Sequence, residues 1–239
     1  MNEWEEHLEE LRRRVVVVLV VFFAASAAAF VFSSHIAAFL MAPVARFGVQ
    51  LYTFAPTEKF MAYLYLSVWT GTLFTAPFFF LQTALFLWPA LRGDEYRWAA
   101  AVLFVVPSLF TLGAALCYRF LAPVVFGFLL SFGAGDGIAS LWGLREYLGL
   151  LFDLMLAVGL LLQMPLALLV LIVAGVVSPR RVARCRPHIV LVIFLLAAVL
   201  TPPDVISQVM LGVPVYLLFE GALFLGRILR VRSADDEVK

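Results

Sequence analysis

Residues 12–32 read RRRVVVVLVVFFAASAAAFVF: arginines followed by an apolar run in which Ser26 is the only polar residue. As an α-helix the run from Val15 to Phe32 rises roughly 27 Å at 1.5 Å per residue, close to the roughly 30 Å of hydrocarbon in a bilayer. The run leads into polar sequence without a convincing small-residue cleavage site. We therefore expect a retained spanning helix over 15–32 rather than a cleaved signal peptide.

The whole chain shares this apolar character. Its 239 residues are 64% hydrophobic and 14% charged, and the mean hydropathy is +1.02. A soluble domain carries about 25% charged residues, and here too few polar side chains remain to cover a water-facing surface. Lipid removes that difficulty, because the outer surface can then stay apolar. The composition predicts an all-α integral membrane protein without a nucleic-acid partner.

Further apolar segments follow the first one, and four of them contain an internal proline. Prolines are tolerated in membrane helices where neighbouring groups satisfy the freed backbone carbonyl. The pattern predicts a single transmembrane domain over 1–239, with a cytoplasmic amphipathic segment over 1–14 and a cytoplasmic tail over 226–239. The six predicted spans cover about 15–32, 60–91, 98–121, 147–177, 188–200 and 205–225.

The last two spans are predicted to be short. The fifth rises only roughly 20 Å, and the Pro202-Pro203 pair prevents a simple extension. We expect the last two helices to form a shallow hairpin and the bilayer to be thinner at that point. Asp204 is placed to cap the sixth helix, and Pro56, Pro202 and Asp204 are predicted to be structural turn residues.

The basic residues indicate the orientation. With six spans, 13 of the 17 Lys and Arg side chains fall on the side that holds both termini. Positive charge is enriched in cytoplasmic segments, so both termini are predicted to be cytoplasmic.

The sequence offers few candidates for catalytic, metal-binding or cofactor-binding residues. Cys117 and Cys185 belong to separate segments, and His7, His35 and His188 do not cluster. The chain has no phosphate-binding glycine loop, nucleophile elbow or zinc-protease string. We expect no enzyme activity, no catalytic residue, no metal and no cofactor.

Several short sequence motifs lie in a particular order along the chain, at the ends of the predicted spans or inside them. They are His7-Leu8-Glu9-Glu10-Leu11-Arg12-Arg13-Arg14, Pro56-Thr57-Glu58-Lys59-Phe60, Ala76-Pro77, Gln82, Phe86-Leu87-Trp88-Pro89-Ala90-Leu91 with Asp94-Glu95, Gln163-Met164-Pro165, Leu200-Thr201-Pro202-Pro203-Asp204-Val205-Ile206-Ser207-Gln208 and Phe219-Glu220. In this order and spacing the chain resembles the TatC family, the multi-spanning receptor subunit of the twin-arginine protein translocase, over almost its whole length.

The resemblance implies a concave, glove-like bundle in a bacterial cytoplasmic (inner) membrane. It implies a receptor that binds the twin-arginine signal peptides of folded proteins at its cytoplasmic face. The partners would be single-span TatA/TatB-type subunits, the lipid bilayer and other copies of the chain itself. Export would be driven by the protonmotive force.

The family's signal-binding carboxylates match Glu10 and Glu95. A planar guanidinium pairs bidentately with a carboxylate, so acidic groups near the lipid boundary suit a ligand with two arginines. Without the resemblance, Glu10 is a helical partner for Arg14, four residues on. Glu95 is equally well a loop acid at the start of the third span, a role that Asp94 could also take.

Three further residues complete the predicted peptide site. Arg12 has an ordinary role in anchoring the positive-inside topology, although the family resemblance adds it to the binding surface. Phe86 and Leu91 could line an apolar groove for the hydrophobic part of the signal peptide, with packing between helices as the default interpretation.

Polar groups inside the membrane are functional candidates. Gln163, beside Pro165, occupies a position where many family members have glutamate, and it cannot ionise. We predict contact with a partner subunit there, involving Gln163, Pro165 and Glu220. Glu220 has a structural ion pair as its ordinary role, with Arg227 on a similar face. Asp153 could pair with Arg119 or Arg145, or face water.

A secondary transporter of a small solute or ion is the alternative function. It would use Asp153, Gln163 and Glu220, and it predicts that these three residues converge on one cavity near the middle of the membrane.

Overall fold

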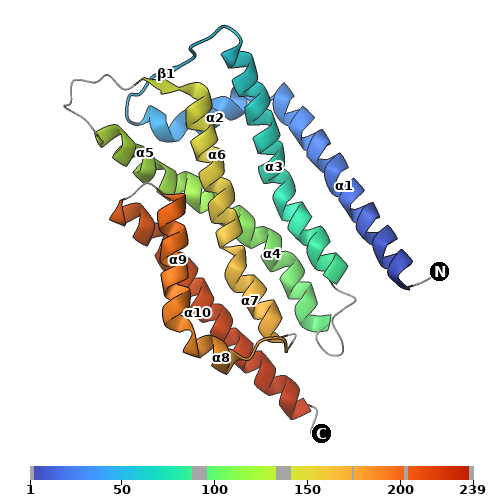
Figure 1. Ribbon diagram of the computed structural model, residues 1–239. Helices are drawn as coiled ribbons and strands as arrows, with labels where there is room; N and C mark the ends of the chain where they lie inside the picture. Colours follow the sequence, from blue (N-terminus) through green and yellow to red (C-terminus); the bar gives the residue numbers. More distant parts are fainter. Residues whose placement is uncertain (1–2, 88–95, 133–140, 174, 202–203, 237–239) are drawn as a thin grey trace.

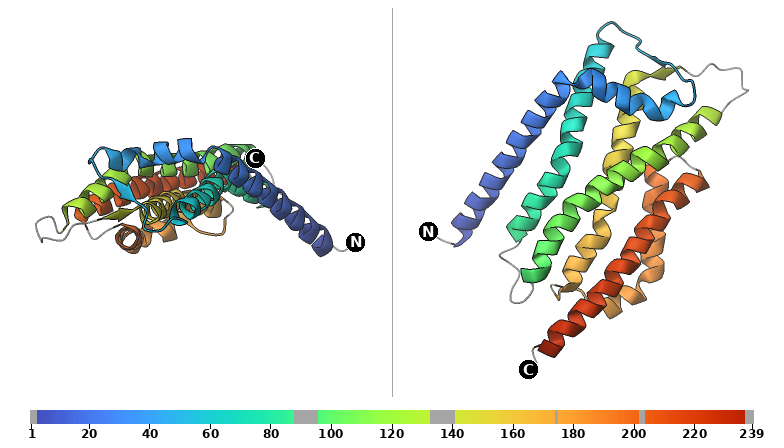
Figure 2. Two further views of the ribbon diagram at one scale, coloured as in Figure 1. Left: turned by 90° about the horizontal axis from the view of Figure 1, so that it is seen from above. Right: turned by 180° about the vertical axis from the view of Figure 1, so that it is seen from behind.

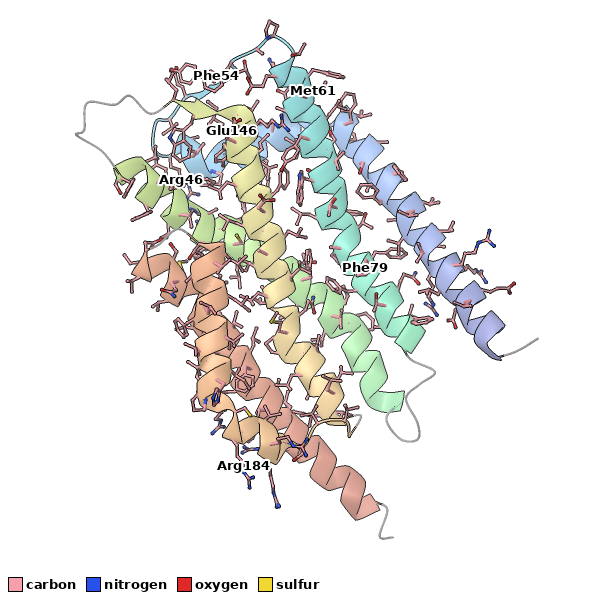
Figure 3. The ribbon with its side chains drawn as sticks, in the orientation of Figure 1. Arg46, Phe54, Met61, Phe79, Glu146 and Arg184 are labelled. Atoms are coloured by element: carbon pink, nitrogen blue, oxygen red, sulfur yellow. The ribbon has the colours of Figure 1, made fainter. Side chains whose placement is uncertain are left out.

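Long helices that run between two ends of the molecule make up the computed structural model of the chain (Figure 1). It describes residues 3–87, 96–132, 141–173, 175–201 and 204–236. Both chain termini lie at one end, here called the terminal end. The opposite end, called the loop end, holds the two short strands. Arg46, Phe54 and Glu146 mark the loop end, and Arg184 marks the terminal end (Figure 3).

The first helix, α1 (Glu3–Val31), contains both the predicted amphipathic segment and the first predicted span. No break separates the two parts, because residues 8–14 are Leu, Glu and Arg, which are good helix formers, and neither glycine nor proline lies near the junction. The next helix, α2 (Ser33–Ala45), lies across the loop end (Figure 1). Gly48 follows it with a φ of 70°, a conformation that glycine adopts without a side-chain clash.

Two strands of two residues each join distant loops at the loop end. β1 (Leu51–Tyr52) pairs in parallel with β2 (Trp142–Gly143). After β1 the chain turns at Pro56 and enters α3 (Glu58–Leu87). The Glu58 carboxylate accepts backbone N–H bonds from Phe54 and Ala55, which holds this turn against the helix start.

The third span is longer than predicted. α4 (Tyr96–Leu116) continues through a π turn, η3 (Cys117–Leu121), into α5 (Ala122–Ser131). The prediction ended this span at about residue 121. Pro123, two residues later, has no N–H to donate within an α-helix. The π turn lies directly before Pro123 and gives the backbone an alternative pairing there, so the apolar sequence stays helical to Ser131.

The fourth span is interrupted near Gln163. α6 (Leu144–Leu161) and α7 (Gln163–Val173) are separated by Leu162. Pro165 has no N–H to donate to the carbonyl four residues earlier, at Leu161, which accounts for a break at this point.

The last part of the chain contains three helices: α8 (Pro179–Arg184), α9 (Arg186–Leu200) and α10 (Val205–Asp236). α9 is short, as predicted, and rises about 22 Å. α10 was expected to end near residue 225 but continues to Asp236, because the charged residues that follow the apolar segment remain helical beyond it. The adjoining ends of α9 and α10 lie well below the loop end of α6 (Figure 1).

Within the described ranges, five helical segments are long and apolar enough to cross a bilayer: Leu8–Val31, Glu58–Phe86, Phe104–Ser131, Leu144–Val173 and Val205–Ile228. α9 is a shorter apolar helix that forms a hairpin with α10. The chain is therefore a multi-pass, all-α membrane protein, and the shared position of its termini agrees with an even number of crossings.

The helices form a flattened, open arrangement rather than a round bundle, in keeping with the predicted glove-like shape (Figure 2). One buried cluster joins η3, α5, α6, α7, α8, α9 and α10, and a second joins α2, α3, α5 and α6 near the loop end. α1 stands at the edge, where it packs mainly on α3.

The contact between α1 and α3 depends on a glycine. A Cβ atom added at Gly71 would lie 2.9 Å from the backbone nitrogen of Ser26 and 3.0 Å from its Cα. No side chain larger than hydrogen fits at that distance without moving the helices apart. Small residues allow this kind of backbone approach between membrane helices.

Candidate functional site

Arg14 joins α1 to the last turn of α3 at the terminal end. Its Nη1 donates to the side-chain Oε1 of Gln82 at 3.0 Å, and its Nη2 donates to the carbonyl of Leu85 at 3.3 Å. The last carbonyls of a helix have no N–H partner within the helix. A guanidinium there satisfies such a group and interacts favourably with the negative end of the helix dipole.

The same guanidinium holds Glu10. Arg14 Nε donates to Glu10 Oε1 at 3.0 Å, and Nη2 lies 2.5 Å from the same oxygen. This is the contact between residues four apart that the sequence offered as the ordinary interpretation of Glu10. Within the described part of the chain, Glu10 Oε2 accepts no hydrogen bond, and the side chain is 34% exposed. The carboxylate therefore keeps lone pairs for a second donor.

A hollow of about 560 Å³ lies over the same stretch of α1. Charged groups of both signs surround it, together with two apolar side chains: it is lined by Glu9, Glu10, Arg12, Arg13, Val16 and Val17. Arg12 is exposed at its edge. The arrangement offers carboxylates and apolar surface side by side at the terminal end.

The other predicted peptide-site residues belong to α3 and the segment after it. Phe86 is half-buried in the last turn of α3, close in the chain to Leu85, which contacts Arg14. Glu95 and Leu91 lie outside the described residues. Glu95 directly precedes the first residue of α4, Tyr96, and α4 begins at the same end of the bundle where α3 finishes (Figure 1).

Gln163 is bonded across the bundle. Its Nε2 donates to the backbone carbonyl of Val106 in α4 at 2.8 Å, and the side chain is half-buried. Pro165 is buried one turn into α7. The amide thus links the α6–α7 break to the proline-containing part of α4, because Val106 immediately precedes Pro107.

Glu220 forms an ion pair with a partner other than the one expected. Its Oε2 lies 2.7 Å from Arg186 Nη2 at the start of α9, and its Oε1 accepts a hydrogen bond from the Tyr216 hydroxyl at 3.2 Å. The prediction of Arg227 as partner was wrong, because spacing along one helix cannot reveal an arginine that the neighbouring helix supplies.

The turn residues lie as follows. Asp204 Oδ2 accepts the backbone N–H of Ser207 at 2.8 Å, which is the arrangement of a helix N-terminal cap. Pro56 lies in the turn before α3. Pro202 lies outside the described residues.

The three residues that a transporter would use do not meet in the structure. Gln163 binds Val106 and Glu220 binds Arg186, whereas Asp153 is exposed on α6 and forms no ion pair with Arg119 or Arg145 in the described part of the chain. Neither the hollow of α1 nor the apolar pocket between η3, α6 and α10 is lined by any of the three. The geometry gives no support to the transporter alternative.

Comparison with known proteins identifies the family of the chain. The family model described as "Sec-independent protein translocase protein (TatC)" matches residues 6–214. The chain belongs to the TatC family. Such proteins are components of a protein translocase, so the chain has a role in protein transport that involves a complex.

Individual members of the TatC family are similar over nearly the whole chain. The TatC protein of Magnetococcus marinus is 36% identical over 97% of this chain and 86% of its own length. That of Aquifex aeolicus is 32% identical over 93% of this chain and 94% of its own. A crystal structure described as the twin arginine translocase receptor TatC in DDM superposes with a TM-score of 0.77 at 32% identity, covering 92% of this chain and 99% of the other.

The sequence reasoning missed two parts of this site. Arg14 was considered only as a partner for Glu10, although it also binds Gln82 and Leu85. Glu9 was not singled out, although it lines the hollow beside Glu10. The Glu10–Arg14 spacing signals the ion pair, but no local pattern signals a contact between residues 14 and 82.

Proposed function

We propose that the chain is the receptor of its translocase and binds the twin-arginine signal peptides of folded cargo at the terminal end. In this proposal Glu10 and Glu95 pair with the two arginines of the signal peptide. Arg12 borders the binding surface, and Phe86 and Leu91 contact the apolar segment of the peptide. The chain carries out no chemistry on its cargo.

The observation that supports this proposal best is the state of the Glu10 carboxylate. It already accepts one guanidinium, that of Arg14, on a single oxygen and in a fixed orientation. Its side chain stays one-third exposed beside the hollow of α1. Two parallel bonds from a guanidinium need a carboxylate that is oriented and reachable, and Glu10 has both properties.

The lipid boundary increases the strength of such a pair. The apolar part of α1 begins directly after Arg14, so Glu10 lies within about two helical turns of hydrocarbon. An ion pair in a medium of lower dielectric constant is stronger than an exposed surface pair in water. A signal peptide whose arginines precede an apolar segment can match both the carboxylate and the adjacent lipid.

Localisation and partners belong to the same proposal. The terminal end would face the cytoplasm of a bacterium, because Arg180, Arg181 and Arg184 lie there together with the arginine-rich start of α1. Single-span TatA/TatB-type subunits and further copies would complete the complex. Gln163, Pro165 and Glu220 are the proposed intramembrane contacts for partner helices, and the protonmotive force would drive export.

The test measures binding of a fluorescent twin-arginine signal peptide to the purified protein by anisotropy. Glu10→Gln and Glu95→Gln are each expected to weaken binding by about tenfold, equivalent to about 1.4 kcal/mol, with a larger loss in the double variant. A peptide with both arginines replaced by lysine should also bind less well, because an ammonium lacks the planar fork.

Glu146→Gln is the matched control, because Glu146 is an exposed acid of the loop end (Figure 3). It should bind the peptide as the unaltered protein does. Unchanged affinity in the double Glu10 and Glu95 variant would overturn the proposal.

A further inference from the structure

Two opposite charges lie inside the spans without a described partner of opposite sign. Asp153 is exposed in α6, and Arg119 is exposed in the π turn η3. The ion pairs found in the described part of the chain involve neither residue. Charged side chains within a membrane are rare and almost always pair, face a water-filled cavity or reach the interface. Their exposure in one copy therefore calls for partners from outside it.

The surroundings of Asp153 leave its charge uncompensated. Tyr65 of α3 lies within electrostatic reach of both Asp153 and Arg145. Arg145 lies over the Tyr65 ring, with its guanidinium carbon 6.0 Å from the ring centroid, and makes no ion pair with Asp153. A tyrosine hydroxyl can solvate a carboxylate but cannot neutralise it.

Arg119 is in the complementary situation. Its guanidinium carbon lies 5.8 Å from the centroid of the neighbouring Phe120 ring, which is a weak cation–π contact. No carboxylate lies within ion-pair distance of it among the described residues. The guanidinium keeps its full positive charge and most of its donors.

The side chains of Asp153 and Arg119 project from opposite faces of the layer formed by α4 and α6. Val158 and Gly159 of α6 lie against Gly113 of α4, and at 100° per residue they are about 140° and 120° round the helix from Asp153, on either side of its back. Cys117 is buried in the core shared with α6, and the exposed Arg119, two residues further along the π turn, lies on roughly the opposite side of the helix. α4 and α5 cover the back of α6 in Figure 1 and are in front in the reverse view of Figure 2.

The two charges also lie at similar depth. Asp153 is about 14 Å along α6 from its first residue, Leu144, at the loop end. Arg119 is about 18 Å along η3 and α5 from Ser131, and this helix is more inclined than α6, which shortens its distance in depth (Figure 1). A neighbouring copy in the same orientation would bring the two charges to one level.

We propose that Asp153 of one copy pairs with Arg119 of a neighbouring copy of this chain within the membrane. The contact joins the front face of one copy to the back face of the next. Such a heterologous contact repeats, and it gives a ring when the rotation closes and a row when it does not. The proposal is independent of signal-peptide binding, so its failure would leave the receptor function untouched.

Disulfide trapping tests the contact without removing either charge. In a background carrying Cys117→Ala and Cys185→Ser, Ala157→Cys and Ala115→Cys introduce one thiol each, one helical turn from Asp153 and from Arg119 and on the terminal side of both. When the two single-cysteine chains carry different tags and are expressed together in membranes, mild oxidation should give a dimer that contains both tags.

Phe104→Cys replaces Ala115→Cys in the matched control, because Phe104 is an exposed residue of α4 roughly 22 Å from Arg119 along the helix. Its disulfide yield with Ala157→Cys should be at least about tenfold lower. Equal yields from the two pairs would overturn the proposal.

Charge variants test whether the ion pair carries the contact. Asp153→Asn or Arg119→Gln, added to both trapping chains, should lower the yield at least about fivefold, and Asp153→Arg should abolish trapping through like-charge repulsion. Asp153→Arg together with Arg119→Asp in each chain should restore it, which a merely structural role for either residue would not do. A yield that is indifferent to these changes, as expected if Arg119 binds only lipid phosphate, would overturn the proposal.

Discussion

The two ion pairs found among the described residues, Glu10–Arg14 and Glu220–Arg186, have the same chemistry but different construction. Glu10 and Arg14 belong to one helix and lie one turn apart, and Arg14 also binds the last turn of α3. Glu220 and Arg186 belong to different helices, and Tyr216 takes the second carboxylate oxygen. The first pair leaves an oxygen of Glu10 without a described partner, whereas the second uses both oxygens of Glu220.

The difference separates a pair that can accept a ligand from a pair that fastens helices. Removing a charge from the α9–α10 pair should loosen the protein, because the other polar contact between these helices among the described residues is a single hydrogen bond, from Gln208 to the Phe194 carbonyl. Removing one from the Glu10 pair should alter the end of α1 while the rest of the bundle remains. Four substitutions test this distinction.

The largest effect is expected from Gly71→Val, which should detach the α1 region alone. The new Cβ would meet backbone atoms of Ser26 at 2.9–3.0 Å, and backbone cannot move aside as a flexible side chain can. We expect a loss of about 2–3 kcal/mol, seen as a lower Tm in detergent, and a loss of contact between Arg14 and Gln82.

Gly221→Val provides the control for Gly71→Val. Gly221 is exposed in α10, and nothing lies within 4 Å of an added Cβ there. The free energy of unfolding of this variant should lie within about 1 kcal/mol of that of the unaltered protein. Equal melting of the two valine variants would contradict the tight contact between α1 and α3.

Arg186→Leu should give the next largest effect, in the other region. It leaves Glu220 with only the Tyr216 hydroxyl, and we expect a loss of about 1–3 kcal/mol because both side chains are partly exposed. Thermal unfolding in detergent measures it, with the exposed Arg184→Leu as control. Adding Glu220→Gln should recover part of the loss, and no recovery would argue against the ion pair as its cause.

Arg14→Gln should have a smaller effect on stability, about 1 kcal/mol, because its pair with Glu10 is local and partly exposed. The expected change is in mobility: amide hydrogen exchange over residues 8–14 should become faster, while exchange in α9 and α10 stays the same. Arg13→Gln is the control, since Arg13 is exposed. Unchanged exchange would show that Arg14 does not hold the end of α1 on α3.

Gln163→Leu should give the smallest effect of the four. It removes one hydrogen bond between helices, to the Val106 carbonyl, and such bonds contribute about 0.6 kcal/mol on average in a membrane. Thermal unfolding compared with that of Met164→Leu, an exposed neighbour, measures the difference. A loss as large as that of Arg186→Leu would mean that Gln163 has the fastening role assigned here to the α9–α10 pair.

Most of the fold could be predicted from sequence because apolar length is a strong signal in membrane proteins. Among the described residues, helices cover most of each predicted span, although the fourth span is not helical beyond Val173. The short α9 follows from the apolar stretch 188–200, which ends just before a proline pair. The end of the third span was missed, because sequence gives no indication that a π turn will accommodate Pro123. The straight continuation of α10 beyond residue 225 was missed because charge marks the membrane surface and not the end of a helix.

The candidate site could be predicted only where its contacts are local. The Glu10–Arg14 pair follows from helical spacing, and the Asp204 cap from its place before α10. The contacts of Arg14 with Gln82, of Gln163 with Val106 and of Glu220 with Arg186 each join helices far apart in the sequence. Their partners depend on how the helices rotate and tilt in the bundle, which a single sequence does not specify.

The parallel pairing of β1 with β2 has a mechanical consequence. It ties the start of α3 to the start of α6, and the Tyr147 hydroxyl adds a 2.6 Å bond to the Leu40 carbonyl of α2 nearby. These contacts fix the helices to one another at the loop end. If the helices move apart, the separation must be greatest at the terminal end, where the hydrogen bonds of Arg14 hold α1 against α3.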